Sequence, residues 1–254
     1  MFDLDRLNSA TKYPSILTYH ALGDRGRLTD EVQVDLRTDT VSVTEKVDGT
    51  NARIVVHDGR YIIGSREEFL HADGDLIYNP AQGIVDVIKP VAEKCLASGL
   101  GLSWVLFGEV YGGRVSAASK MYTGGDSSLT GFRVFDVVLF EVRDMTALLA
   151  REKSEISAWR ESGGQPFLTV EAQEDVCRQL GLHRVPEVAS TVPPSGLQET
   201  FAWLKGVLPG STGVALHGAP SGQPEGVVVR TKDRSRIAKL RFEDYERTFR
   251  SKGK

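Results

Sequence analysis

Alternating and β-branched apolar residues predict a series of short strands along the chain. In chain order these strands cover residues 41–46, 51–57, 60–64, 103–111, 132–142, 225–231 and 236–241. Asp58-Gly59 separates the second and third strands and is typical of a tight hairpin turn. The runs at 103–111 and 132–142 are apolar almost throughout, which indicates buried strands. The pattern predicts a protein built largely from antiparallel sheets.

Apolar residues at helical spacing predict helices between these strands. The predicted helices cover residues 82–97, 145–161, 170–180 and a segment near 196–207. Pro90 lies inside the first of them and predicts a break or a kink there. The region 190–224 is rich in Pro, Gly and Ser, which predicts surface loops. Helices placed between antiparallel strands predict an α+β fold.

The composition is that of an ordinary globular protein, with 41% hydrophobic and 26% charged residues among 254. No apolar run approaches the roughly 20 residues that cross a bilayer, and residues 1–8 lack the pattern of a secretory signal. Cys95 and Cys177 are the only cysteines, and they lack metal-ligand spacing. We therefore expect a cytoplasmic protein that has no membrane contact.

The net charge of −3 conceals an uneven distribution along the chain. Residues 230–254 contain ten Lys or Arg against four Asp or Glu, a balance of +6. A basic end of this kind suits a polyanionic partner, because phosphate contacts supply most sequence-independent affinity for nucleic acids. A solvated tail is an equally ordinary explanation of the same residues.

Residues 44–51, T-E-K-V-D-G-T-N, place Lys46 between two predicted strands, just before an Asp-Gly turn. Such a lysine is either an amine nucleophile presented at a turn or a solvated side chain beside ordinary turn chemistry. The octapeptide alone supports both interpretations equally. The rest of the chain has to decide between them.

Five later features carry residues suited to phosphate or nucleotide chemistry. They are Gly64-Ser65-Arg66, F-G-E-V-Y-G at 107–112, F-R-V-F-D at 132–136, E-G-V-V-V-R at 225–230 and I-A-K-L-R at 237–241. Lys239 and Arg241 are two residues apart, so both lie on one face of a predicted strand. Taken singly, each feature also has a structural explanation, such as a core position for Phe135 or a surface position for Arg66.

In this order, K-V-D-G, F-G-E-V-Y-G, F-R-V-F-D, E-G-V-V-V-R and A-K-L-R resemble the motifs of covalent nucleotidyltransferases, which include polynucleotide ligases and mRNA capping enzymes. Within that superfamily the chain is most similar to the ATP-dependent type 2 (phage-type) RNA ligases, through Glu45, Asn51 and the Ser65-Arg66 pair. The resemblance implies an ATP-grasp-like ligase adenylylation domain of mainly antiparallel sheets with flanking helices.

The resemblance implies a catalytic group that consists of Lys46, Asp48, Glu225, Lys239 and Arg241. In it, Lys46 attacks the α-phosphate of ATP, expels pyrophosphate and holds AMP through a phosphoamide bond. Lys239 and Arg241 hold the phosphate and offset its charge. Arg241 stands where the family usually has a second lysine, so its charge is kept while its geometry differs.

The resemblance also implies residues that bind the nucleotide, the metal and RNA. The nucleotide-binding residues are Glu45, Asn51, Arg66, Glu109 and Phe135, with Phe135 stacked on adenine. Glu109 and Glu225 are the expected ligands of Mg²⁺ or Mn²⁺. The expected RNA contacts are Asn51, Arg66, Arg247 and Arg250. The implied substrate is RNA with 5′-phosphate and 3′-OH ends, which the enzyme joins, and RNA repair is the expected role.

For the domain organisation, we expect a nucleotidyltransferase domain over residues 1–242 and a short basic tail over 243–254. An OB-fold domain is not expected, because about a dozen residues follow Arg241. We therefore expect that the recognition of RNA ends comes from the core, the basic end or a partner protein.

Other functions of the same superfamily stay open at this point. A DNA-joining ligase is disfavoured by the pairing of Glu45 with Lys46 and by the absence of an OB-fold domain, and a capping guanylyltransferase by that absence alone. An alternative from a different class is a nucleotide-binding or RNA-binding module that has lost ligation. Against such a module stand the retained Lys46, Glu109, Glu225 and Lys239, because binding alone does not require the lysine.

Overall fold

The computed structural model describes residues 3–37, 40–72, 75–76, 83–99, 103–216, 218 and 222–250. The chain forms two compact units, each assembled from two stretches of sequence. Unit 1 contains residues 1–15 and 49–184, and unit 2 contains residues 16–48 and 185–254. The K-V-D-G segment therefore spans a boundary along the chain, since Asp48 is the last residue of its unit 2 stretch and Gly49 opens the next stretch of unit 1.

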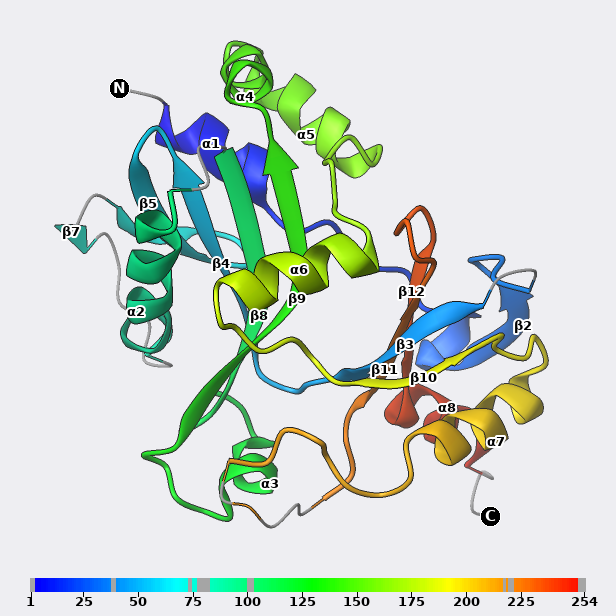
Figure 1. Ribbon diagram of the computed structural model, residues 1–254. Helices are drawn as coiled ribbons and strands as arrows, with labels where there is room; N and C mark the ends of the chain where they lie inside the picture. Colours follow the sequence, from blue (N-terminus) through cyan, green and yellow to red (C-terminus); the bar gives the residue numbers. More distant parts are fainter. Residues whose placement is uncertain are drawn as a thin grey trace. The chain divides into compact units, whose positions relative to one another are not determined.

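Unit 1 contains a six-stranded antiparallel sheet in the order β7-β6-β5-β4-β8-β9 (Figure 1). The strands are β4 (Thr50–His57), β5 (Arg60–Ser65), β6 (Phe69–Ala72), β7 (Asp75–Leu76), β8 (Ser103–Gly112) and β9 (Thr130–Phe140). Asp58 and Gly59, with φ of 51° and 71°, join β4 to β5, which confirms the predicted hairpin turn.

Helices cover both faces of this sheet and bury two apolar clusters. They are α1 (Leu4–Thr11), α2 (Ile84–Ala97), α3 (Ser119–Thr123), α4 (Val142–Leu149), α5 (Lys153–Glu161) and α6 (Val170–Gln179). Ile88 of α2 and Cys177 of α6 belong to the cluster on one face. Leu7 of α1, Met145 of α4 and Ile156 of α5 belong to the cluster on the other. The two clusters make unit 1 a three-layer structure, which confirms the predicted α+β class.

Unit 2 contains a four-stranded antiparallel sheet in the order β10-β3-β11-β12, with α7 and α8 beside it (Figure 1). Its strands are β3 (Val41–Lys46), β10 (Glu187–Thr191), β11 (Gly226–Arg230) and β12 (Ile237–Arg241), and its helices are α7 (Leu197–Val207) and α8 (Phe242–Phe249). Strands β1 (His20–Leu22) and β2 (Leu28–Val32) form a two-stranded sheet, and the short 3₁₀ turn η1 (Asp24–Gly26) lies between them in the chain. One apolar cluster joins all these parts, from Tyr19 and Leu28 to Leu204 and Tyr245.

The structure differs from two of the predictions about helices. The predicted helix over 145–161 is two helices, α4 and α5, separated by residues 150–152. Helix α2 continues through Pro90 without a break in its assignment. Pro90 removes one backbone hydrogen bond, but Ile84, Ile88 and Ala92 on the same helix are buried against the sheet. Packing of the apolar face therefore outweighs the local effect of proline.

The basic segment after Arg241 is a packed helix as far as Phe249, and the prediction of a tail from residue 243 is wrong over that part. Tyr245 of α8 is 1% exposed, and its hydroxyl lies 2.8 Å from Nδ1 of His20. Nε2 of His20 lies 2.9 Å from the carbonyl oxygen of Ser195. A carbonyl only accepts, so Nε2 donates to it and Nδ1 accepts from the tyrosine hydroxyl. Burial lowers the pKa of His20, which keeps this neutral tautomer.

Gly108, at the centre of F-G-E-V-Y-G, is required by a close approach inside the unit 1 sheet. A β-carbon at this position would lie 2.3 Å from the Phe132 ring and 2.7 Å from the carbonyl oxygen of Arg133. Phe132 packs against the apolar cluster of α2 and α6, so it cannot move away without disturbing that cluster. The glycine in this motif is therefore explained by packing.

We expect Gly108→Ala to lower the free energy of unfolding by about 1–3 kcal/mol, because the added methyl group overpacks the sheet. Urea denaturation measures the change. Gly206→Ala is the control, since Gly206 lies in α7 with no atom within 4 Å of a β-carbon there. That control should raise stability by about 0.5–1 kcal/mol. A stable Gly108→Ala protein with an unchanged midpoint would contradict the packing argument.

Candidate functional site

Three cationic side chains share one face of the unit 2 sheet. Lys46 of β3 is paired with Gly226 of β11, which is paired with Arg241 of β12. Lys239 lies two residues before Arg241 and is paired with Val228. Directly paired residues point to the same face. The opposite face carries Val43, Val227 and Leu240 in the core, so the cations lie on the face that the apolar cluster leaves open.

Lys46 forms an ion pair with Glu225, which immediately precedes β11. The Lys46 Nζ donates to Oε2 of Glu225. The two side chains are 27% and 22% exposed, so the pair is partly screened from water. The peptide N–H of Phe242 donates to the Glu225 carbonyl at 3.0 Å and fixes the backbone there. The structure therefore brings two of the predicted catalytic residues into direct contact.

Arg241 is held by a carboxylate on the first turn of α8. Its Nε and Nη2 donate to the two oxygens of Asp244 at 2.8 and 3.0 Å, and Asp244 is 1% exposed. Burial alone would lower the pKa of Arg241, but the hydrogen bonds and charge of Asp244, with Glu225 and Glu243, raise it above its usual value. Arg241 is therefore a fixed cation.

Two arginines of the basic end, predicted as RNA contacts, differ in their surroundings. Arg247 donates to the Gly26 carbonyl at 3.1 Å and pairs with Glu243 and Asp244, so its guanidinium is occupied in holding α8. Arg250 is 80% exposed and lies 3.9 Å from Glu246. Of these two arginines, Arg250 is therefore the one with a largely solvent-exposed side chain.

Glu45 has a different environment from the nucleotide contact that the sequence predicts. Its neighbour in the register is Val227, on the core side of the sheet, and its carboxylate is buried. That carboxylate accepts from the Thr212 hydroxyl at 2.5 Å and from the Gly213 N–H at 2.8 Å. Glu45 thus anchors the 212–213 loop to the strand that carries Lys46.

In unit 1, Asn51, Glu109 and Arg133 form a row across β4, β8 and β9. All three are half-buried and, by the register, share one face. The Asn51 Oδ1 is buried and lacks a hydrogen-bond partner among the described residues. The sequence interpretation included the first two and missed Arg133. The strand alternation, which places residue 133 two before Phe135, was the available signal.

Phe135 lies in a bulge of β9, between Val134, which is paired with Gly108, and Asp136, which is paired with Phe107. The Phe135 ring lies 5.0 Å from Tyr13 in an edge-to-face arrangement and 6.5 Å from Phe107. The Tyr13 hydroxyl donates to Asp136 at 2.6 Å. Phe135 is half-buried, so it is both part of the apolar cluster and partly exposed. Tyr13 is a second aromatic residue here that no motif indicated.

Arg66 lies exposed on the turn that follows β5, and buried Arg53 supports that turn. Nη1 of Arg53 donates to the Arg66 carbonyl at 3.3 Å, and Nη2 donates to Asn8 of α1. Arg66 itself reaches the Ser15 hydroxyl at 3.3 Å. Arg53 is 0% exposed, and burial lowers its pKa to about 9 in spite of the nearby charge of Glu67.

The remaining predicted residues concern metals and the lysine loop. Among the described residues, no group of three or more His, Cys, Asp or Glu forms a metal cage. Single carboxylates suit Mg²⁺ and Mn²⁺ that retain water and substrate phosphate as further ligands, so Glu225 and Glu109, one in each unit, are suitable in donor chemistry. Asp48 is half-buried at the end of its unit 2 stretch. No helix within the described ranges is long and apolar enough to cross a membrane.

Antiparallel sheets and a strand-end lysine that shares a sheet face with two further cations are the features that the sequence resemblance predicts. A family model for RNA ligase matches residues 39–242, and the chain belongs to the RNA ligase family. No curated protein matches.

Solved structures with the same fold include RNA ligase from Naegleria gruberi. The structure with pyrophosphate has a TM-score of 0.56 and 15% identity, and the match covers 93% of this chain and 64% of that one. A variant of that ligase with ATP and Mn has a TM-score of 0.52 and 15% identity, with 92% and 62% covered. The chain thus spans less than two thirds of the length of the ligase it matches.

We expect Glu45→Gln to lower the stability of the protein by about 1–3 kcal/mol. The amide would turn a donor toward the Gly213 N–H or the Thr212 hydroxyl and leave a buried polar group unsatisfied. Urea denaturation and proteolysis of the 212–213 loop measure the effect. Exposed Glu31 of β2 provides the matched control, and Glu31→Gln should stay within about 0.5 kcal/mol. Equal stability of both variants would refute the anchoring role of Glu45.

Proposed function

We propose that this protein is an ATP-dependent RNA ligase that works through a lysyl-AMP intermediate. The observation that carries the proposal is Lys46, paired with Glu225 and placed on the same sheet face as Lys239 and Arg241, in a chain of the RNA ligase family. A lysine nucleophile beside fixed cations suits attack on a phosphate, because such a transfer depends on positioning and charge neutralisation.

In the first step, the Lys46 Nζ gives up a proton and attacks the α-phosphorus of ATP. A P–N bond forms to the lysine, and the P–O bond to the departing pyrophosphate breaks. Lys239 and Arg241 offset the negative charge around the α-phosphate. The Glu225 ion pair must open before this step, because an ammonium has no lone pair for the attack. Glu225 is then the carboxylate nearest to the reacting nitrogen.

The nucleotide itself is proposed to meet residues of unit 1. Phe135 offers a partly exposed ring for stacking on adenine, and the support of Tyr13 keeps that ring in place. The row of Asn51, Glu109 and Arg133 supplies polar groups for the ribose or phosphates. The buried Asn51 Oδ1, which lacks a hydrogen-bond partner among the described residues, is suited to accept a hydrogen bond from the ribose. Mg²⁺ or Mn²⁺, held by Glu109 or Glu225, would neutralise phosphate charge when bound.

In the later steps the AMP passes from Lys46 to the 5′-phosphate of an RNA end. A 3′-hydroxyl then attacks that phosphate, the new phosphodiester forms and AMP leaves. Arg66 and Asn51 are proposed to contact the RNA ends, with Arg250 as a further contact. RNA repair in the cytoplasm, with a partner protein that helps to recognise ends, is the proposed setting.

We expect incubation with ATP and Mg²⁺ or Mn²⁺ to increase the intact mass of the protein by one AMP. Lys46→Arg should abolish the increase, because it keeps the charge next to Glu225 but not the amine nucleophile. Exposed Lys89 of α2 supplies the control, and Lys89→Arg should be labelled like the natural chain. Failure to label with either metal, or labelling of Lys46→Arg, would defeat the proposal.

We expect sealing of a nick that ends in a ribonucleotide 3′-OH to exceed sealing of an all-DNA nick by roughly tenfold or more, since a site that recognises a 2′-hydroxyl discriminates strongly against its loss. Gel analysis of ligated, nicked and 5′-adenylylated strands measures both steps. Equal sealing of the two substrates would point instead to a DNA-joining ligase. Accumulation of 5′-adenylylated RNA without sealing would indicate that a partner is needed.

A further inference from the structure

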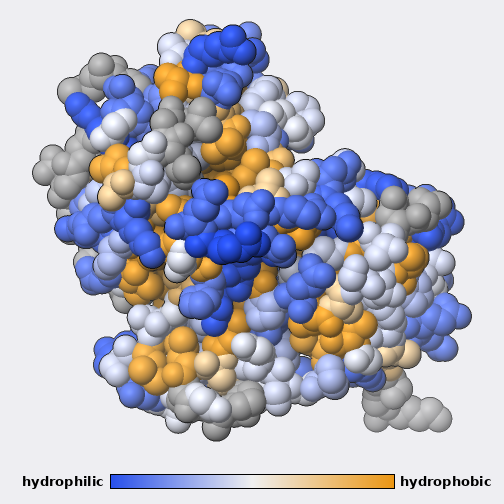
Figure 2. Space-filling model, viewed as in Figure 1, coloured by the Kyte–Doolittle hydropathy of each residue, from blue (hydrophilic) through white to orange (hydrophobic). Residues whose placement is uncertain are grey.

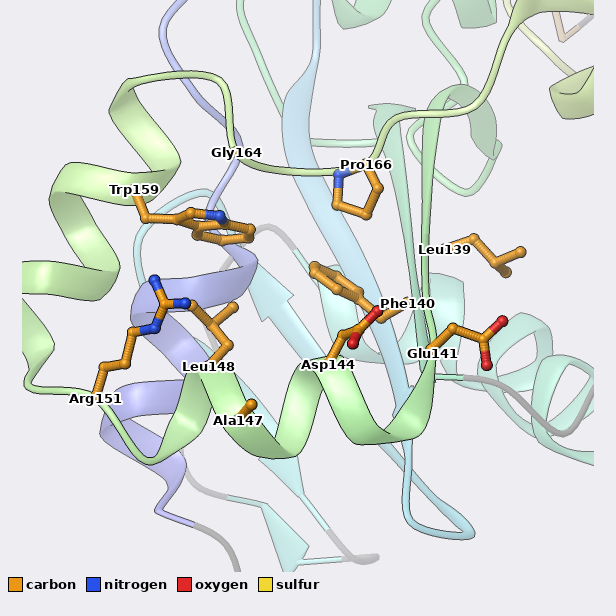
Figure 3. Close-up of a pocket in the computed structure, with 10 residues that line it drawn as sticks. All are labelled: Leu139, Phe140, Glu141, Asp144, Ala147, Leu148, Arg151, Trp159, Gly164 and Pro166. Carbon is orange, nitrogen blue, oxygen red and sulfur yellow. The ribbon is translucent and has the colours of Figure 1, made fainter.

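A cavity of about 440 Å³ lies in unit 1, where the end of β9 meets α4 and α5. Phe140 and Leu148 supply its buried apolar part, and Trp159 of α5 and Pro166 line the same space (Figure 3). Figure 2 shows apolar surface at the end of β9, bordered by hydrophilic residues. Its residues are distinct from those proposed for adenylylation.

The Trp159 indole is held in one orientation by its surroundings. Its ring centroid lies 6.2 Å from that of Phe140. The Gly164 N–H donates to the backbone carbonyl of Trp159 at 2.9 Å. A β-carbon on Gly164 would lie 2.1 Å from the indole Nε1, so the glycine backbone covers that part of the ring closely. An aromatic surface fixed in this way loses little conformational freedom when a flat ligand stacks on it.

Polar and charged side chains border this apolar space. In the part of the chain that the structure describes, Glu141 and Arg151 form no ion pair, and the Trp159 Nε1–H has no acceptor. Asp144 lies 3.6 Å from Arg143 alone. Figure 3 shows Arg151, just after α4, extending toward Trp159, and Asp144 of α4 pointing toward Phe140, whereas the carboxylate of Glu141, just before α4, points away from Trp159. Apolar cavities with a few convergent polar groups are typical of ligand sites.

The chemistry of the lining points to a nucleotide. A flat base stacks on tryptophan, a guanidinium meets phosphate, and a carboxylate such as that of Asp144 accepts from the exocyclic amino group of a base, as Asp and Glu do from cytosine N4. One arginine with two carboxylates is a poor surface for the double-stranded phosphate backbone, which requires a run of cations. The lining therefore favours a single unpaired nucleotide.

We propose that this cavity binds one unpaired, amino-bearing base of an RNA strand, cytosine above uracil, stacked on Trp159 with its phosphate near Arg151. The identification of RNA as the source of the nucleotide rests on the proposed ligase function. The site would be a contact with the strand that is separate from the residues proposed for adenylylation, and it would select single-stranded RNA.

The indole N–H signals in a two-dimensional ¹H–¹⁵N spectrum test this proposal directly. The chain has three tryptophans. Trp104 is 1% exposed and the Trp203 Nε1 is buried, so both serve as internal references. The probes are hexamers of cytidylate and uridylate with 5′-hydroxyl ends, which cannot be adenylylated. We expect the Trp159 signal, assigned from its loss in Trp159→Phe, to move with the cytidylate hexamer at lower concentration than with the uridylate hexamer.

Substitutions separate the three parts of the site by fluorescence anisotropy with labelled hexamers. Trp159→Leu keeps an apolar side chain but removes the ring, and should weaken binding at least about fivefold, whereas Trp159→Phe weakens it less. Arg151→Met should weaken binding and lower its salt dependence by about one ion. Asp144→Asn should remove the preference for cytidylate. Arg178→Met on α6, where the side chain is 74% exposed, is the control and should leave binding unchanged.

Binding by Lys46→Arg keeps this proposal independent of the ligase proposal. If the indole signal moves in Lys46→Arg as in the natural chain, the cavity binds RNA whether or not lysyl-AMP forms. A Trp159 signal unmoved by saturating hexamer, or equal affinities in Trp159→Leu and Arg178→Met, would overturn the proposal and favour a protein segment as the occupant. Equal movement by the two hexamers would overturn the assigned base preference.

Discussion

The antiparallel register of β3, β11 and β12 is the constraint on which the proposed chemistry depends. It pairs Lys46 with Gly226 and Gly226 with Arg241, so residues far apart in the sequence lie on one sheet face. Since side chains alternate along a strand, a slip of one residue in β12 would turn both Lys239 and Arg241 toward the core. Burial of Ala238 and Leu240 in the apolar cluster opposes that slip. The packing on one face thus fixes the charges on the other.

The Lys46–Glu225 ion pair describes a resting state more than a reacting one. It orders both side chains, and the ammonium in such a pair is unable to attack phosphorus until it gives up a proton. Removal of the Glu225 carboxylate would therefore have two opposed effects on the attack. The amine would be released from the ion pair, but its position would be less well fixed. For this reason, the proposed reaction depends on charged groups around the lysine whose charge a bound nucleotide and its metal would balance.

The sequence predicted the parts of the fold that local pattern determines. Strand 41–46 agrees with β3 at both ends, and the Asp-Gly hairpin is present, because alternation and turn chemistry act over a few residues. The core direction of Glu45 and the burial of α8 were missed, because they depend on partners such as Thr212 and His20 that lie far away in the chain. The division into two units could not be predicted either, since each unit is assembled from separated stretches.

The arginine at position 241, where the resemblance predicts lysine, has a structural explanation in α8. Its planar fork meets both oxygens of Asp244, a geometry that the single ammonium of lysine cannot reproduce. Asp244 also lies 3.4 Å from Arg247, so the same carboxylate joins β12 to the helix that follows it. A cation tied down in this way keeps its charge in place while giving up mobility. In the proposed mechanism, Arg241 would therefore act on a phosphate as a cation whose position Asp244 fixes.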